Sequence, residues 1–190
     1  MATRPASRGL ANRVRIIGGT WRSRQIRVAA HGELRPTPDR VRETLFNWLG
    51  QDLSGRTCLD LYAGSGALGY EAASRRAARV VMVERDRGVF DALERTRIAL
   101  DATSVELVRA DALEFLRGDG GRYDVVFLDP PFRDANWPRI LVALPDRLNP
   151  GALVYAESAT PLEPPAGWEI RKKSRAGQVS YQLLQRAQNE

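Results

Sequence analysis

The stretch Tyr123-Asp124-Val125-Val126-Phe127-Leu128-Asp129-Pro130-Pro131-Phe132 decides the fold and points to the site. Its apolar run is typical of a strand buried in a parallel sheet, with Asp129 at the carboxyl end, where ligands of open α/β sheets bind. Two successive prolines lack backbone donors and leave the carbonyl groups of Asp129 and Pro130 free to accept hydrogen bonds. With the flat ring of Phe132, this group suits a planar ligand that carries an amino group. A strand that merely ends at a Pro-Pro turn, with Phe132 in the core, is the structural alternative.

The size and composition of the chain limit its class. Its 190 residues are enough for one α/β domain with a small appendage. The single Cys58 excludes a disulfide framework and favours a reducing cytosol, so we expect a cytoplasmic protein. One cysteine and one histidine do not make a zinc site, and we expect no metal. No apolar run is long enough to span a membrane, and no signal-peptide core is present at the N-terminus.

The net charge of +6 is distributed unevenly. Residues 1–42 hold ten arginines against two acidic residues, so the basic excess lies at the N-terminal end. We expect residues 1–12 to be a disordered basic arm, residues 13–50 an RNA-binding hairpin and helix, and residues 51–190 a near-neutral body. An arginine-rich tail that is merely solvated is the structural alternative.

The N-terminal region alternates apolar and basic residues on both sides of Gly18-Gly19, which predicts a β-hairpin with a dry face and a cationic face. The dry face holds Val14, Ile16, Ile26 and Val28, and Trp21 is expected to pack near it rather than stack on a base. The cationic residues predicted to bind RNA are Arg13, Arg15, Arg22, Arg24, Arg27 and, from the following segment, Arg40.

A helix with an apolar stripe follows the hairpin. Val41, Leu45, Trp48 and Leu49 recur at helical spacing, and we expect this helix to pack the N-terminal region onto the body. Thr37 is placed to act as its N-cap, and Pro38 suits its first position.

Strand and helix patterns then alternate. Strands are predicted at 57–61, 80–83, 105–108, 123–128 and 152–156, with helices at about 67–76, 87–100, 113–116 and 140–144, and a closing antiparallel pair at 168–172 and 179–184. This alternation predicts a doubly wound, mostly parallel sheet that ends in the antiparallel pair.

An acidic residue follows each of the first strands. The turn Gly64–Gly69 matches GxGxxG, a signal shared by NAD enzymes and adenosylmethionine enzymes and therefore weak alone. Asp60, just before it, favours a cationic amino group and would repel a pyrophosphate. Glu84 is placed to accept hydrogen bonds from ribose hydroxyl groups, and Asp111 from an adenine amino group. For any one of these acids, a solvated strand end is the structural alternative.

The combination resembles the class I S-adenosylmethionine-dependent methyltransferases, which have a Rossmann-like fold, and Asp129–Phe132 is similar to the D/N-PP-Y/F motif of enzymes that methylate planar amino nitrogens. A resemblance to the RsmD family covers nearly the whole chain. The segments that carry it are Arg15–Arg22, Leu34–Thr37, Asp39–Leu49, Leu59–Gly69, Asp129–Phe132 and Ala176–Tyr181.

This resemblance implies methylation of the 2-amino group of a guanine in 16S rRNA, in the helix 31 loop at position 966 in customary rRNA numbering, within an assembling small subunit. It implies a catalytic segment of Asp129, Pro130, Pro131 and Phe132. The residues implied for S-adenosylmethionine are Asp60, Tyr62, Ala63, Gly64, Ser65, Gly66, Glu84, Arg85, Asp111 and Ala112, with Arg35 and Thr37 over the pocket. We expect a monomer, because no feature indicates an obligate partner subunit.

Other functions share part of these signals. A DNA adenine-N6 methyltransferase has the same tetrapeptide but usually a larger domain for base recognition. A protein-glutamine methyltransferase normally has Asn where this chain has Asp129. An NAD oxidoreductase has no use for Asp60 and the tetrapeptide. The non-enzymatic alternative is an RNA-binding ribosome-assembly factor that has retained a cofactor fold.

Overall fold

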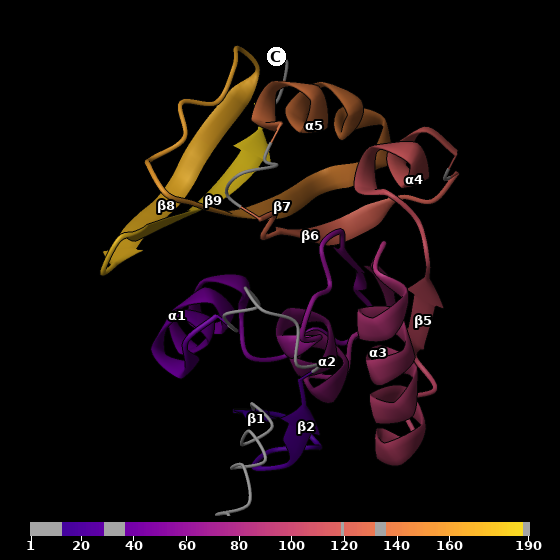
Figure 1. Cartoon of the computed structure of the whole chain (residues 1–190). Coiled ribbons are helices and arrows are strands. Elements are labelled where there is room, and N and C mark those ends of the chain that lie inside the picture. The colour runs from indigo at the N-terminus through magenta and orange to yellow at the C-terminus, as the bar shows by residue number, and fades with distance from the viewer. Residues whose placement is uncertain (1–12, 29–36, 119, 132–135, 188–190) are drawn as a thin grey trace, which may run out of the picture.

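A seven-stranded sheet is the centre of the molecule in this computed structural model, which describes residues 13–28, 37–118, 120–131 and 136–187 (Figure 1). Its strands are β3 (Thr57–Asp60), β4 (Arg79–Val83), β5 (Val105–Val108), β6 (Tyr123–Leu128), β7 (Leu148–Ser158), β8 (Trp168–Ala176) and β9 (Val179–Arg186). They lie in the order β5-β4-β3-β6-β7-β9-β8, and β9 runs antiparallel to both of its neighbours. The strand order reverses between β3 and β6, so the topological switch point lies at the carboxyl ends of these two strands.

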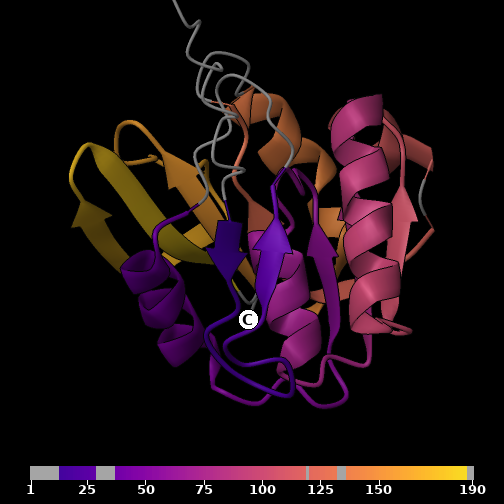
Figure 2. The same cartoon turned by 60° about the horizontal axis from the view of Figure 1, so that its bottom comes forward.

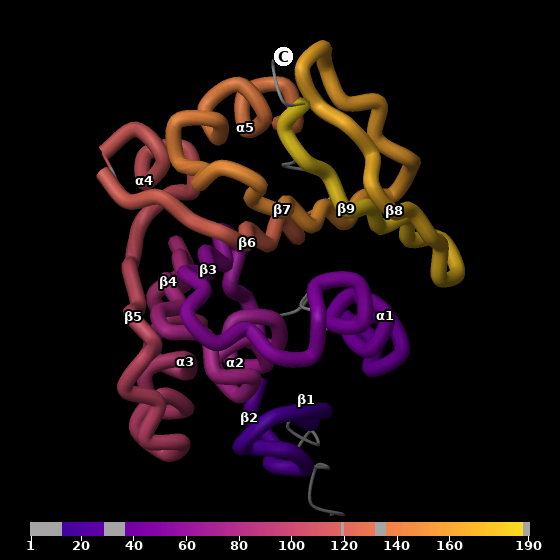
Figure 3. The backbone as a smooth tube through the Cα atoms, turned by 180° about the vertical axis from the view of Figure 1, so that it is seen from behind, coloured from indigo at the N-terminus to yellow at the C-terminus, as the bar shows by residue number. Residues whose placement is uncertain are grey.

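Helices cover both faces of the sheet (Figures 1 and 3). One face carries α1 (Asp39–Leu49), α2 (Ala67–Ser74) and α3 (Arg87–Leu100), and the other carries α4 (Ala112–Gly118) and α5 (Trp137–Ala143), with the short 3₁₀ helix η1 (Pro145–Arg147) before β7. Because successive strand residues point to opposite faces, Val125 packs toward α1–α3 and Val126 packs toward α4 and α5. The predicted doubly wound, Rossmann-like sheet with a closing antiparallel pair is confirmed. Among the described residues, no helix combines the length and the apolarity needed to cross a membrane.

The predicted N-terminal hairpin is also confirmed, as β1 (Arg13–Arg15) paired antiparallel with β2 (Gln25–Arg27) (Figure 2). Its dry side chains are at most 5% exposed and belong to the same core as α1 and the sheet face beneath it. Trp21 packs against this core, as predicted. The turn approaches α2 so closely that a Cβ atom on Gly19 would lie 1.8 Å from the Ser74 carbonyl oxygen, and Gly19 has a φ of +75°. Only glycine fits there.

A buried charge network joins the hairpin to the body. The Glu71 carboxylate on α2 accepts hydrogen bonds from the backbone N–H groups of Ile17 (2.8 Å) and Gly18 (2.7 Å). The same carboxylate pairs with the guanidinium groups of Arg42 (3.4 Å) and Arg75 (2.9 Å), and all three side chains are at most 4% exposed. Because an unpaired buried charge is costly, each partner of this network depends on the others.

The start of α1 corrects the prediction. Thr37 does not cap the helix: Pro38 is the N-cap residue, the first helical residue is Asp39, and no side chain caps the helix. The Thr37 hydroxyl group instead donates a hydrogen bond to Asp129. The apolar stripe of α1 is confirmed at Val41, Leu45 and Leu49, and the buried face also includes Phe46.

Removing the charge of Glu71 tests the network. We expect Glu71→Gln to lower the free energy of unfolding by about 3–5 kcal/mol, because the buried guanidinium group of Arg75 loses its counter-ion and that of Arg42 keeps only Asp39. The matched control is Glu106→Gln, whose partner Arg79 lies at 2.7 Å with both side chains about half exposed. The control should lose at most about 1 kcal/mol. Urea denaturation followed by circular dichroism measures both, and equal losses would contradict this account.

Candidate active site

Four acidic residues lie at the carboxyl edge of adjacent parallel strands. Asp60 is the last residue of β3, Glu84 directly follows β4, Asp129 directly follows β6, and Asp111 follows β5. Because β3 and β6 pair with Asp60 beside Phe127, Asp60 and Asp129 lie on the same face of the sheet, toward α1 and α2. The two acids therefore flank the switch point.

The Asp60 carboxylate is buried and only half satisfied. Its Oδ2 atom accepts a hydrogen bond from the Gly69 backbone N–H at 2.9 Å. Its Oδ1 atom is the one buried side-chain polar atom without a hydrogen-bond partner among the described residues. Burial raises the pKa of Asp60 to about 7, against the lowering effect of the Gly69 hydrogen bond. An unpaired carboxylate oxygen at this depth fits a ligand that brings its own donor, such as an ammonium group.

The glycine turn is shaped by its neighbours on both sides. Gly66 has a φ of +79°, and a Cβ atom there would lie 2.5 Å from the Tyr70 ring. The Gly64 backbone N–H donates to Glu84 Oε2 at 3.0 Å, and the Asp86 N–H donates to Oε1 at 2.8 Å. Glu84 thus holds the turn against the end of β4. At Gly69, a Cβ atom would lie 2.6 Å from the Met82 sulfur, so the glycine allows α2 to pack on β4.

Asp111 has a structural role of its own. Its Oδ1 atom accepts hydrogen bonds from the backbone N–H groups of Leu113 (2.9 Å) and Glu114 (3.2 Å), at the first turn of α4. Burial raises the pKa of Tyr62 to about 12, and the charge of Asp111 raises it further while that of Arg85 lowers it. Asp111 and Arg85 are therefore near enough to Tyr62 to act on its pKa. Their predicted contact with an adenine ring stays a prediction.

Asp129 is held by Thr37. The Thr37 hydroxyl group donates to Asp129 Oδ2 at 3.2 Å, and the Thr37 carbonyl oxygen accepts from Arg42 Nε at 3.2 Å. Burial, then the charge of Glu157, raises the pKa of Asp129 well above its ordinary value, and the Thr37 hydrogen bond opposes this rise. Asp129 is half-buried, and Pro130 is buried while Pro131 is exposed. Thr37 was predicted to lie over the cofactor pocket, and this stays a prediction; its hydroxyl group contacts Asp129.

Glu157 is a site residue that the sequence-based prediction missed. Leu128 of β6 pairs with Ala156 of β7, so Asp129 and Glu157 extend side by side. The Glu157 side chain is 5% exposed, and its Oε2 atom accepts a hydrogen bond from the Tyr155 hydroxyl group at 2.9 Å. Burial raises the pKa of Glu157 as well, while hydrogen bonds from Tyr155 and Thr37 lower it. The signal was present, since Glu157 directly follows a predicted strand as the other acids do.

The remaining predicted site residues differ in what the structure shows of them. Arg35 and Phe132 are outside the described residues. Ala63 and Ala112 are buried at the edge, and Ser65 accepts a hydrogen bond from Ala67 N–H at 3.3 Å. The arginines predicted to bind RNA are all exposed: Arg13, Arg15, Arg22, Arg24, Arg27 and Arg40. Two of them have partners, because Arg13 donates to Gln25 and Arg15 pairs with Asp39.

Comparison with known proteins gives a consistent result. The family model described as "Conserved hypothetical protein 95" matches residues 14–185. Ribosomal RNA small subunit methyltransferase D of Escherichia coli K12 is 44% identical, over 95% of this chain and 94% of that protein. The enzyme of the same name from Haemophilus influenzae is 42% identical, over 90% and 93%. The solved structure of yhhF, a candidate methyltransferase from Escherichia coli, has a TM-score of 0.83 at 44% identity, covering 92% of this chain and 98% of that one.

The buried carboxylate of Asp60 predicts a specific pH dependence of stability. Between pH 3.8 and about 7 the folded protein keeps a proton at Asp60 that the unfolded chain has lost, so this residue makes stability fall as pH rises. Asp60→Asn still offers an oxygen to Gly69. We expect it to be more stable than the parent at pH 8, by up to about 4 kcal/mol, and nearly equal at pH 4.

The measurement is urea denaturation at both pH values. Exposed Asp91→Asn on α3 is the control and should change stability little at either pH. A variant at Asp60 that is less stable than the parent at pH 8 would show that the ionised carboxylate is stabilising, contrary to this reading.

Proposed function

The chain belongs to the RsmD family of ribosomal RNA small subunit methyltransferases, and from this premise we propose that it transfers a methyl group from S-adenosylmethionine to the 2-amino group of a guanine in 16S rRNA. The proposed position is the helix 31 loop, residue 966 in customary rRNA numbering, in a small subunit or its assembly intermediate. The protein acts as a cytoplasmic monomer and without a metal in this proposal.

The observation that carries the proposal is the pair of acids at the switch point. Asp60 has an unpaired buried oxygen on the β3 side, and Asp129 lies on the β6 side of the same face. A methyl transfer needs a site for the donor and a site for the acceptor next to each other. Two carboxylates on neighbouring strand ends provide these two sites.

The donor side fits S-adenosylmethionine, which supplies a methyl group activated by its sulfonium. Asp60 Oδ1 would accept from the ammonium group, and the turn of Ala63, Gly64, Ser65 and Gly66 lies beside it. Glu84 would accept from the ribose hydroxyl groups. Tyr62, Arg85, Asp111 and Ala112 would surround the adenine, with Arg35 over the pocket.

On the acceptor side, Asp129 and the Pro130 carbonyl would accept hydrogen bonds from the two N–H groups of the guanine 2-amino group. The lone pair of this nitrogen is delocalised into the ring, so the amine is a poor nucleophile. Two acceptors out of the ring plane draw the nitrogen toward tetrahedral geometry and expose the lone pair. Asp129 then takes the proton that the nitrogen loses. Phe132 would stack on a base taken from a loop, where unstacking costs little.

The exposed arginines of the hairpin and α1 would contact RNA phosphates and orient the loop. The location of these arginines supports this part of the proposal, because the hairpin and the start of α1 lie on the face of the sheet to which Asp60 and Asp129 point. The glycine turn at Gly19 and the network around Glu71 hold the hairpin against that face.

The test is a methylation assay on small subunits isolated from cells that lack this protein. We expect N2-methylguanosine at one position of 16S rRNA, located by mass spectrometry, and no methylation of duplex DNA under the same conditions. Asp129→Ala should lower the rate at least about 100-fold, since it removes the acceptor of the amine proton. Its affinity for S-adenosylmethionine, measured by calorimetry, should change far less. Methylation of adenine, or comparable turnover by the variant, would contradict the proposal.

A further inference from the structure

An acid that the proposed function leaves unused lies next to Asp129. Glu157 is more deeply buried than Asp129, on the neighbouring strand, with its Oε2 atom held by the Tyr155 hydroxyl group at 2.9 Å. The Thr37 hydroxyl group, which donates to Asp129, also lies close enough to Glu157 to lower the pKa of that carboxyl group by hydrogen bonding. Thr37 thus lies between the two carboxyl groups.

The surroundings of the pair are acidic and phenolic. The charges of Glu157 on β7 and Asp60 on β3 both act on Asp129, and burial, then the charges of Glu157 and Asp129, raises the pKa of Tyr155. The Tyr155 ring lies 6.4 Å from the Tyr181 ring of β9. None of the ion pairs found among the described residues includes Asp129 or Glu157. The guanidinium group of Arg42 donates to the Thr37 carbonyl and pairs with Asp39 and Glu71.

We propose that Glu157 is a positioning residue of the acceptor site, which acts on Asp129 through its charge and through Thr37 to make Asp129 a stronger proton acceptor for the amine. This inference rests on the proposed function. Two ionised carboxyl groups side by side without a cation repel each other, so the doubly ionised pair takes up one proton more readily than an isolated carboxylate does.

The proton balance is simple. The nitrogen lone pair forms the N–C bond to the methyl group, whose former bonding pair stays with the sulfur of the donor. One N–H bond breaks, its electron pair remains on nitrogen, and its proton forms an O–H bond on Asp129. Glu157 stays ionised and keeps the hydrogen bond from Tyr155, so the one proton that the pair takes up is on Asp129. Thr37 continues to donate to Asp129 before the transfer.

Glu157→Gln tests the inference, because glutamine keeps an acceptor for Tyr155 and removes the charge. The measurement is the pH profile of kcat/KM on small subunits. Without the like charge, Asp129 loses its proton at lower pH, so the acid limb should move down by about 1 pH unit. The plateau should fall several-fold, because a weaker base takes the amine proton less well. A merely structural role would lower the rate equally at all pH values and leave the midpoint unchanged.

A second readout needs no turnover. Carbon-13 NMR of protein labelled at aspartate carboxyl groups follows the Asp129 titration in the free protein, with the signal assigned through Asp129→Asn. The Asp129 midpoint should fall in Glu157→Gln and stay unchanged in the control Glu106→Gln. If Glu157→Gln does not fold, Tyr155→Phe decides: it removes the hydrogen bond that favours ionised Glu157, and should give a smaller shift in the same direction.

The outcomes are distinguishable. An unchanged midpoint in a folded variant overturns the role of Glu157. If the parent protein methylates no small subunit while its Asp129 midpoint still responds to Glu157→Gln, the proposed function fails and the electrostatic pairing stands.

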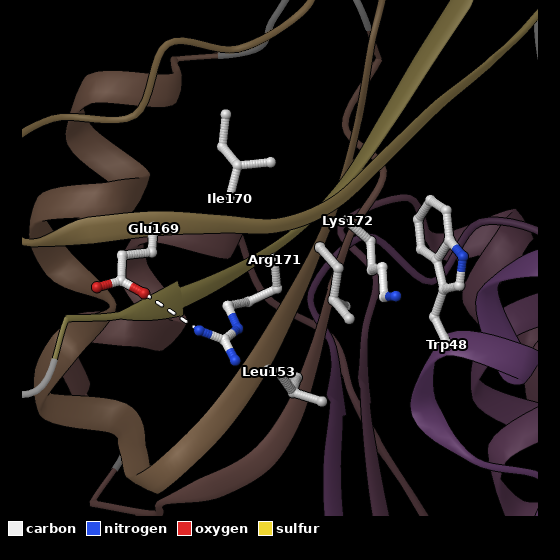
Figure 4. A pocket seen from close by; sticks show the side chains of 7 residues that line it. Trp48, Leu153, Glu169, Ile170, Arg171 and Lys172 are labelled. Atoms are coloured by element: carbon white, nitrogen blue, oxygen red, sulfur yellow. Dashed lines mark hydrogen bonds and ion pairs between the residues drawn. The ribbon is translucent and has the colours of Figure 1, made fainter.

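A second inference comes from the edge of the sheet. Strand β8 exposes Arg171, Lys172, Lys173 and Arg175. Arg171 pairs with Glu169 at 3.3 Å, whereas none of the ion pairs found in the described part of the chain includes Lys172 or Lys173. Figure 4 shows the groove of 390 Å³ next to this strand, with Trp48 of α1 on one side and Lys172 and Arg171 on the other.

The pairing of the strands shows how far this edge lies from the acceptor site. Glu157 pairs with Tyr181 of β9, and Tyr181 pairs with Ser174 of β8. Two strand spacings of about 4.8 Å therefore separate the row of Ser174 from that of Glu157. The next cation along, Arg175, lies one residue beyond Ser174 at the same edge. Lys172 lies on the same face of the sheet as Ser174 and Glu157, whereas Lys173 and Arg175 point to the opposite face at the same edge.

We infer that β8 is a phosphate-contact strand for the RNA whose base enters the acceptor site, again on the premise of the proposed function. Its four cations match a polyanion, and the Trp48 ring at the groove offers a surface for stacking. The other use of cations on an edge strand is to prevent pairing with another sheet. That use predicts self-association, and no change in RNA affinity, when the cations are removed.

The test uses Lys172→Gln/Lys173→Gln, with Arg56→Gln/Arg95→Gln as a control of equal charge at other exposed positions. Binding to the same small subunits is measured by filter retention over a salt series. The slope of log affinity against log salt should fall by about 1 per lysine in the β8 variant and much less in the control. Equal slopes for the variant and the parent overturn the inference. A parent protein that binds no small subunit contradicts the proposed function instead.

Discussion

The contact between Arg42 and Glu71 is the constraint on which the arrangement of this protein depends. Both side chains are fully buried, and each has partners on two sides. The Glu71 carboxylate accepts hydrogen bonds from two backbone N–H groups of the hairpin turn. Arg42 donates to the carbonyl oxygen of Thr37, and the hydroxyl group of Thr37 donates to Asp129. Glu71 also pairs with Arg75, and Arg42 also pairs with Asp39, so losing either ion leaves the remaining buried charges less well compensated, which costs several kcal/mol. The hairpin and the acceptor carboxylate are thereby fixed relative to each other.

At the carboxyl edge of the sheet, by contrast, the buried acids are not paired with cations in the described part of the chain. Asp60, Asp129 and Glu157 are acids whose pKa values are raised by burial, and none has a cation partner among the described residues. Such groups reduce the stability of the free protein and fit a ligand that brings donors. The two kinds of buried charge therefore have different roles. Ions that are paired within the protein hold its elements together, and acids without a cation partner serve the proposed chemistry.

The sequence predicted those features that follow from local pattern. Strand and helix periodicity predicted the sheet, and α3 has the predicted bounds, because long apolar patterns with turns between them depend little on distant contacts. Thr37 was wrong as a cap, since its hydroxyl group is taken by Asp129, 92 residues away. The burial of Arg42 could not be predicted from local pattern either, because its partner Glu71 belongs to another helix. Glu157 was missed although it follows a strand, because the fifth strand carried no motif.

In the proposed function, the choice of substrate follows from how these parts combine. A carboxylate and a prolyl carbonyl can accept hydrogen bonds from any planar amine, so Asp129 and Pro130 do not distinguish guanine from adenine or RNA from a protein amide. What reaches them is decided by the surface that surrounds the site. That surface includes the hairpin, α1 and the edge strand β8, and the first two are held by the Arg42–Glu71 contact at a fixed distance from Asp129. Under the proposed function, selectivity therefore depends on rigid placement of basic surface around an acceptor site that does not select by itself, and the buried ion pair supports that placement.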